Sequence, residues 1–208
     1  ELCDRHGVHL IADEIAVGFG RTGTFFACEQ AGITPDFLCI GKGLTGGYLP
    51  LAAVLTREAI YQGFYDEYTT LKAFLHSHSY TGNALGCAAA LATLDLFDAA
   101  PVLASNGRLA EHLGQALAPL RDHPHVGEVR QTGLVAAVEM TPNGDRHSAY
   151  PWQERRGLQV YRHALERGVL LRPLGNVVYF MPPYVITTDE IDLIVAVARE
   201  GIDRATAD

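Results

Sequence analysis

Short apolar runs separated by glycine-rich turns mark the first part of the chain, a pattern typical of an α/β sheet. Residues 1–7 have the pattern of a helix that closes at Gly7. Apolar runs at 8–12, 36–40 and 51–56 predict three strands, the first of them buried. The first link is long enough for a right-handed crossover, so the first two strands are expected to be parallel. The second link, GKGLTGGYLP, has no room for a helix, so the third strand is expected to be antiparallel.

The remainder of the chain predicts a linking helix and a smaller α+β domain. Asn83 is a typical N-cap for the alanine-rich helix predicted over residues 84–97. Residues 57–81 are expected to be irregular. The later elements are predicted as helices at 105–120, 152–167 and 188–205 and strands at 126–130, 134–140, 169–172 and 177–181. We therefore expect two domains, residues 1–100 and residues 101–208.

Composition excludes several classes of protein. Hydrophobic residues make up 48% of the chain and charged residues 19%, enough for a substantial core. A net charge of −8 without any basic block argues against nucleic acid as a partner. No run of about 18 apolar residues predicts a membrane span. The four cysteines lie far apart without a CxxC pair, which favours a reducing, cytoplasmic location.

Lysine chemistry has only two candidates, since Lys42 and Lys72 are the only lysines among sixteen basic residues. Asp13 and Lys42 each follow the end of a predicted parallel strand, where ligands bind in open α/β sheets. A lysine and a carboxylate among glycines are what pyridoxal phosphate needs, one for its aldehyde and one for its pyridine nitrogen. On spacing alone, an ordinary Asp–Lys ion pair explains the same pattern. Lys72 lies in the irregular segment and is expected at the surface.

The segment GFGRTG at residues 18–23 also fits the GxGxxG fingerprint of a nucleotide-binding oxidoreductase. Two features argue against this alternative. Asp13 and Glu14 would place two carboxylates beside the pyrophosphate. Only twelve residues separate Gly23 from Asp36, too few for the usual helix and the acidic residue about 20 positions on.

Three longer segments carry a family resemblance: IADEIAVGFGRTG, PDFLCIGKGLTGGYLPLAAVLT and HSYTGNALGCAAA. Together they resemble the class III aminotransferases of fold type I, which use pyridoxal phosphate. Ala16 and the segment GVLLRPLGNVVYFMPPYVIT are similar to the branch that aminates 8-amino-7-oxononanoate in biotin biosynthesis. The resemblance implies an α/β fold, with the end of a large-domain sheet followed by a C-terminal α+β small domain. Another class III ω-aminotransferase remains the alternative.

The resemblance implies a role for each matched cofactor residue. Lys42 would form the Schiff base with the cofactor and shuttle the proton, and Asp13 would face the pyridinium nitrogen. Ile15 would pack on one face of the ring. Ser79 matches the hydroxyl that binds the phosphate of the neighbouring subunit's cofactor, so a homodimer is implied; Thr81 is a nearby competitor that aligns less well.

Substrate residues are implied in the same way. Arg172 matches the family's carboxylate-binding arginine, whose guanidinium forms two parallel hydrogen bonds. Arg21 and Tyr179 are weaker pocket candidates. S-adenosylmethionine is the leading amino donor. His78 stands where users of that donor tend to have proline, so lysine remains an alternative donor.

Two histidine pairs invite a metal interpretation, His76 with His78 and His123 with His125. Neither pair has a cysteine or carboxylate at ligand spacing, so no metal is expected. The second pair is expected to lie in a solvated loop.

The chain begins at Glu1 within a regular pattern and resembles the C-terminal half of such an enzyme. The family's upstream phosphate cup and ring-stacking aromatic are not among these 208 residues. We therefore expect the chain alone to bind cofactor poorly and to be inactive.

Overall fold

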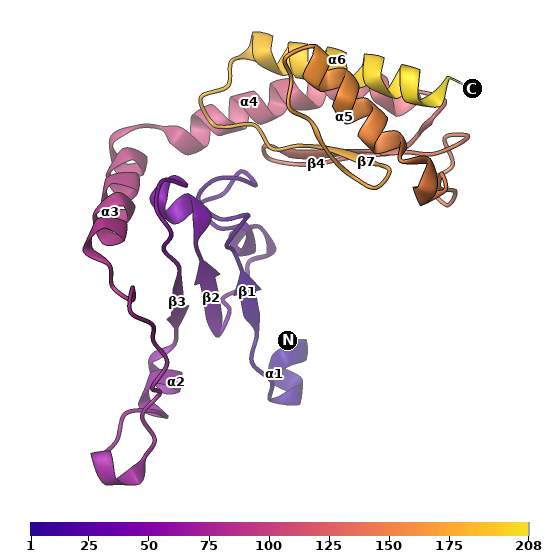
Figure 1. The fold of residues 1–208 in the computed structure, drawn as a ribbon. Helices are drawn as coiled ribbons and strands as arrows, with labels where there is room; N and C mark the ends of the chain where they lie inside the picture. The colour runs from indigo at the N-terminus through magenta and orange to yellow at the C-terminus, as the bar shows by residue number, and fades with distance from the viewer. Residues whose placement is uncertain (208) are drawn as a thin grey trace. The chain divides into compact units, whose positions relative to one another are not determined.

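The computed structural model describes residues 1–207, which form two compact units. The first comprises residues 1–103 and the second begins at residue 104. Figure 1 traces both units, and each is described by itself.

The first unit contains a three-stranded sheet, one long helix and several short helical turns. Its elements are α1 (Leu2–His6), β1 (Ile11–Asp13), η1 (Ala27–Ala31), β2 (Phe37–Ile40), η2 (Lys42–Thr45), β3 (Ala53–Thr56), α2 (Glu58–Gln62), η3 (Tyr68–Thr70) and α3 (Ala84–Ala99). The strand order is β1-β2-β3, with β1 parallel and β3 antiparallel to β2, so both predicted directions are confirmed. The register pairs Asp13 with Cys39, and the chain therefore leaves β1 and β2 at the same edge.

Two predictions for this unit are wrong. The first strand is exposed rather than buried, with Ile11 at 63% exposure, because β1 pairs only with β2 and no second layer covers it within residues 1–207. The segment 57–81 is not wholly irregular, since it contains α2 and η3. These turns are too short for a hydrophobic period to reveal them.

The second unit is a four-stranded antiparallel sheet with helices. Its elements are α4 (Val102–Leu117, which begins just before the boundary), η4 (Ala118–Asp122), β4 (Val126–Thr132), β5 (Val135–Met140), η5 (Trp152–Glu154), α5 (Arg156–Glu166), β6 (Arg172–Leu174), β7 (Val177–Phe180) and α6 (Thr188–Thr206). The strand order is β4-β5-β7-β6. The strand predicted at 169–172 is shifted, because pairing with β7 begins only at Arg172.

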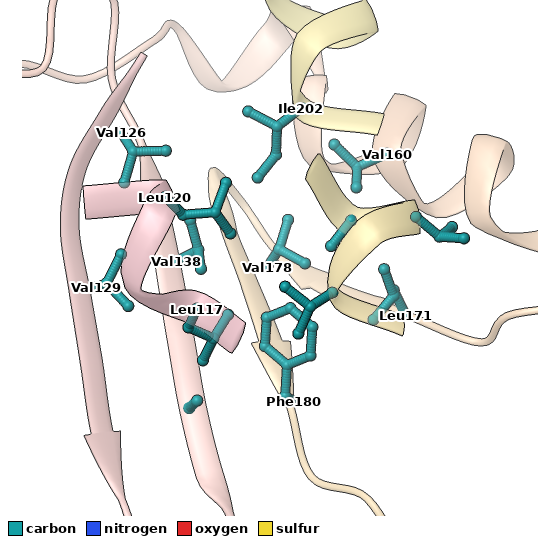
Figure 2. Packing of buried hydrophobic residues seen from close by; sticks show 14 of the residues in the cluster. Leu117, Leu120, Val126, Val129, Val138, Val160, Leu171, Val178, Phe180 and Ile202 are labelled. Atoms are coloured by element: carbon teal, nitrogen blue, oxygen red, sulfur yellow. The ribbon is translucent and has the colours of Figure 1, made fainter. Parts of the chain in front are cut away.

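Alternating burial along β5 and β7 directs one face of this sheet to the core. Helices α4, α5 and α6 contribute further buried side chains, together with β4, η4 and the connecting segments. Figure 2 labels ten members of the cluster: Leu117, Leu120, Val126, Val129, Val138, Val160, Leu171, Val178, Phe180 and Ile202. Helix α6 begins with a capping box, in which Thr187 and Glu190 satisfy each other's backbone amides.

No single helix within residues 1–207 is long and apolar enough to cross a membrane. Only α3 and the chain from Val102 to Asp122, taken together across their break, reach that length and composition.

Candidate active site

Asp13 and Lys42 lie just beyond the ends of the parallel strands β1 and β2. The amide of Glu14 donates to the Cys39 carbonyl at 2.9 Å, which continues the pairing past Asp13. Lys42 begins η2 with φ of 41°, in the left-handed region. Both side chains are exposed, at one edge of one small sheet. The edge predicted from the sequence therefore carries both residues.

The polar contacts of this pair leave it available to a ligand. Oδ1 of Asp13 accepts a hydrogen bond from the Ile15 amide at 3.0 Å. Within residues 1–207 no ion pair joins Asp13 to Lys42, so the simpler ion-pair interpretation does not describe this arrangement. Lys72, in contrast, is exposed and pairs with Asp66.

The loop after β1 is closed by Glu14, whose importance the sequence did not reveal. Its carboxylate is buried, with the residue 2% exposed. It accepts hydrogen bonds from the amides of Ala27 at 2.9 Å and Cys28 at 2.7 Å. Its carbonyl accepts a third, from Gly18 at 2.9 Å. Burial, together with the hydrogen bond and charge of Glu14, raises the pKa of the Cys28 thiol.

This closure contradicts the dinucleotide interpretation of GFGRTG. The loop turns back onto the Glu14 carboxylate, and only the five-residue turn η1 follows it. No long helix therefore presents its N-terminus to a pyrophosphate at this point in the chain. Arg21 lies half-buried in the same loop.

Side chains of this loop flank the backbone of Lys42 on both sides. A Cβ added to Gly41 would lie 3.4 Å from Cγ2 of Ile15. One added to Gly43 would lie 3.0 Å from both Cβ and Cδ2 of Phe19. The approach of Phe19 therefore favours glycine at position 43, while the contact of Ile15 with Gly41 is an ordinary van der Waals distance.

The segment before α3 forms a turn that presents Ser79 to solvent. The His78 amide donates to Oγ1 of Thr81 at 3.1 Å, and Nδ1 of His78 accepts from the Tyr80 amide at 3.1 Å. His78 and Thr81 also line a groove of about 710 Å³ with residues 49–52. Among the described residues no hydrogen bond joins Ser79 to Asp13 or Lys42.

Arg172 and Tyr179 belong to the second unit and face each other across β6 and β7. Arg172 is exposed and forms no ion pair with any residue described. Tyr179 lines a largely apolar groove of about 530 Å³. Directly paired residues project to the same face, so a guanidinium and a phenol stand side by side.

The histidine pairs differ from each other. His76 and His78 are exposed. The prediction that the other pair is solvated is wrong. His123 contacts Asp203 at 2.8 Å, and Nδ1 of His125 lies 2.8 Å from the Tyr150 hydroxyl. Within residues 1–207 no three potential ligands gather into a metal site.

This α/β fold, with a lysine and an aspartate at the ends of neighbouring parallel strands, is found in a known family. Residues 1–200 match the aminotransferase class-III family, so the chain belongs to it. The predicted family and the fold type I architecture are both confirmed.

Particular relatives extend the comparison. The adenosylmethionine-8-amino-7-oxononanoate aminotransferases of Nitratidesulfovibrio vulgaris and Geobacter sulfurreducens are 50% and 48% identical over 99% of this chain. These matches cover 38% and 46% of the relatives, so the chain spans less than half of their length.

Solved structures agree with the curated relatives. The structure of the enzyme of that name from Methanocaldococcus jannaschii has a TM-score of 0.93 at 40% identity, covering 97% of this chain and 47% of that one. An omega transaminase from Pseudomonas jessenii, solved in complex with PMP, has a TM-score of 0.92 at 31% identity, covering 99% and 45%.

Proposed function

We propose that the protein containing this chain is a pyridoxal-phosphate-dependent aminotransferase of biotin biosynthesis that converts 8-amino-7-oxononanoate to 7,8-diaminononanoate. The observation that carries the proposal is the placement of Asp13 and Lys42 beyond β1 and β2. The names of the relatives at 50% and 48% identity support the particular acceptor.

The residues present fit the cofactor. Asp13 uses Oδ1 for the Ile15 amide, and Oδ2 has no hydrogen-bond partner within residues 1–207. Oδ2 would face the pyridine nitrogen and hold its proton. Lys42 is exposed, so Nζ is accessible to the cofactor aldehyde. When bound, pyridoxal phosphate supplies an electron sink for the pair released at the substrate's α-carbon.

The chain's own groups would hold the cofactor and move the proton. Nζ of Lys42, once released by the amino donor, would take the proton from the donor's α-carbon and return it to the cofactor's carbon. Ile15 would pack against the ring, and its place beside Gly41 sets it next to Lys42. Ser79 would donate its hydroxyl to a phosphate oxygen of the neighbouring subunit's cofactor.

Substrate-binding residues are proposed in each unit separately. Arg172 would hold the acceptor's carboxylate through paired N–H groups, and its lack of an ion pair within residues 1–207 supports this role. Tyr179, opposite Arg172, would line the same pocket. Arg21 and His78, which belong to the first unit, are further proposed substrate-binding residues.

A homodimer is supported by the segment that carries Ser79. Many large apolar side chains of this segment are exposed, and exposed apolar surface of this extent is typical of a protein–protein interface. They are Tyr61, Phe64, Tyr65, Tyr68, Leu71, Phe74, Leu75 and Tyr80. A second copy would cover them. The four free cysteines support a reducing, cytoplasmic location.

S-adenosylmethionine is proposed as the amino donor, in keeping with the relatives' names. Lysine is the second candidate, because the family resemblance places His78 where users of S-adenosylmethionine tend to have proline. Another ω-aminotransferase activity is favoured less, since the Pseudomonas jessenii omega transaminase is only 31% identical to this chain.

The test exploits the two lysines of this chain. The full-length protein is loaded with pyridoxal phosphate, and the absorbance of the lysine-bound cofactor is followed after addition of S-adenosylmethionine or lysine alone. Lys42→Ala is expected to abolish this absorbance. Lys72→Ala is the matched control, because Lys72 is exposed and pairs only with Asp66 among the described residues.

Loss of the band with one donor, followed by formation of 7,8-diaminononanoate on addition of the acceptor, would support the proposal and identify the donor. An absorbance band that persists with either donor would indicate that the protein catalyses another aminotransferase reaction. Absorbance that survives Lys42→Ala but not Lys72→Ala would overturn the assignment of the lysine.

A further inference from the structure

We infer that Glu14 is a positioning residue for Lys42, acting through the loop that its buried carboxylate closes. The inference rests on the proposed function, because it assigns Lys42 to the cofactor. It adds a role for a carboxylate that itself touches neither cofactor nor substrate.

The Glu14 carboxylate is committed to the loop backbone. Both of its oxygens accept backbone hydrogen bonds, Oε2 from Ala27 and Oε1 from Cys28. At 2% exposure, no water replaces these partners when one is lost. The Gly18 amide donates a hydrogen bond to the Glu14 carbonyl. Glu14 therefore binds the start of the loop through its carbonyl and the end of the loop through its carboxylate.

The fastened loop reaches Lys42 through two contacts. Ile15, next to Glu14, packs against Gly41. Phe19 packs against Gly43, and its own position is fixed by edge-to-face contacts with Phe25 and Phe26 at 5.3 and 5.8 Å between ring centroids. The residues on either side of Lys42 are thus held by the loop.

The backbone at these contacts is strained. Lys42 and Phe19 have φ of 41° and 58°, a left-handed region that side chains other than glycine rarely occupy. Such conformations persist only where the surroundings determine them. The Gly47 amide donates to the Lys42 carbonyl at 3.1 Å and provides one restraint. Helix α3, which packs against η2, provides a second, and the loop closed by Glu14 provides a third.

The experiment compares two glutamates of the same loop in the full-length protein. Glu14→Gln keeps the shape and one acceptor but turns an N–H toward a backbone N–H. Glu29→Gln is the matched control: Glu29 is exposed, and among the described residues its carboxylate accepts a hydrogen bond only from the nearby Phe26 amide. Glu14→Ala extends the series by removing both acceptors.

Two measurements report on Lys42 itself. One is the pH titration of the absorbance of the lysine-bound cofactor, with kcat and KM for both half-reactions. The other is amide hydrogen exchange at Leu44 and Gly47 in the cofactor-free protein, since these amides donate to the Gly41 and Lys42 carbonyls. A thermal melt identifies any variant that fails to fold.

We expect Glu14→Gln to shift the titration and to lower kcat about 10-fold or more, because small misplacements of reacting groups are costly. KM for the acceptor should change less than kcat, since Arg172, the proposed carboxylate-binding residue, does not belong to this loop. Amide exchange at Gly47 should accelerate. Glu14→Ala, if folded, should change the titration, kcat and exchange more than Glu14→Gln does. Glu29→Gln should match the unaltered protein in every measurement.

A folded Glu14→Gln protein with unaltered titration, kcat and exchange would overturn the inference, as would an equal effect from Glu29→Gln. If the unaltered protein shows no lysine-bound absorbance, the proposed function fails instead. The exchange measurement still decides the positioning role in that case, because it needs no cofactor.

Discussion

Helix α5 approaches the β6–β7 hairpin closely at Gly157, and Gly157→Ala should disturb the hairpin that carries Arg172 and Tyr179. An added Cβ would lie 2.2 Å from the carbonyl oxygen of Gly175 and 2.7 Å from Cβ of Pro173. The first of these atoms belongs to the backbone, so no side-chain rotation relieves the overlap. Either the helix or the hairpin must move.

The size of the effect follows from that overlap. Restoring an ordinary contact requires a shift of about 1 Å, and overpacking of this kind costs ~1–3 kcal/mol. A backbone clash belongs at the upper end, and the gain from replacing a helical glycine, about 0.5–1 kcal/mol, offsets part of it. We therefore expect the free energy of unfolding to fall by about 2 kcal/mol.

Gly107→Ala is the matched control, because Gly107 lies inside α4 and an added Cβ there meets no atom within 4 Å. It should raise the free energy of unfolding by about 0.5–1 kcal/mol. Both variants are measured by urea unfolding of the full-length protein. Gly157→Ala should also raise KM for the carboxylate-bearing acceptor, since Arg172 moves with the hairpin.

Equal stability of the Gly157→Ala protein and the unaltered one, within about 0.5 kcal/mol, would refute the reasoning. So would a loss of stability in Gly107→Ala as large as that in Gly157→Ala. A loss of stability without any change in KM would support the packing argument. It would contradict the proposed role of Arg172 in binding the acceptor.

Three further predictions concern single side chains. Asn83→Ala should lower the free energy of unfolding by about 1 kcal/mol in urea titrations, because the Asn83 side chain accepts hydrogen bonds from two amides of α3; an unchanged midpoint would contradict this. Hydrogen bonds from the Thr187 amide and hydroxyl lower the pKa of Glu190, so its stabilising effect should be complete above the ordinary glutamate pKa and should be lost progressively as the pH falls from there through the lowered pKa. Glu190→Gln should remove that part of the pH dependence of unfolding. Cys28 should react with iodoacetamide only at a pH higher than the pH at which an ordinary thiol reacts, because burial and Glu14 raise its pKa. Rapid labelling at neutral pH would contradict the loop geometry.

Much of the candidate site follows from sequence because Asp13 and Lys42 depend on strand direction, which link lengths predict. The role of Glu14 does not follow in the same way. Adjacent strand residues point to opposite faces, so one of two neighbouring carboxylates turns inward. Which partners it meets depends on the loop folding back to Ala27 and Cys28, thirteen and fourteen residues later.

Long-range partners also explain the error at the second histidine pair. A polar segment with prolines is typical of a solvated loop. His123 nevertheless contacts Asp203, eighty positions later in α6, and its side chain is only 8% exposed. A local pattern carries no information about that contact. The exposure of β1 was not predicted for a related reason. An apolar run indicates that a strand tends to be buried, but it does not show which element packs against it.

The GxGxxG segment shows how the same glycines serve different chemistry. In a dinucleotide site they let backbone amides approach a pyrophosphate at a helix N-terminus. Here Gly18 is required because a Cβ would lie 2.9 Å from the Glu14 carbonyl oxygen, while Gly20 and Gly23 have φ of 85° and 107°. All three therefore serve the folding of the loop onto its own buried carboxylate. The segment's link to catalysis is then indirect: it places Phe19 against the backbone next to Lys42, and that is why a motif that imitates one cofactor's fingerprint accompanies residues suited to another.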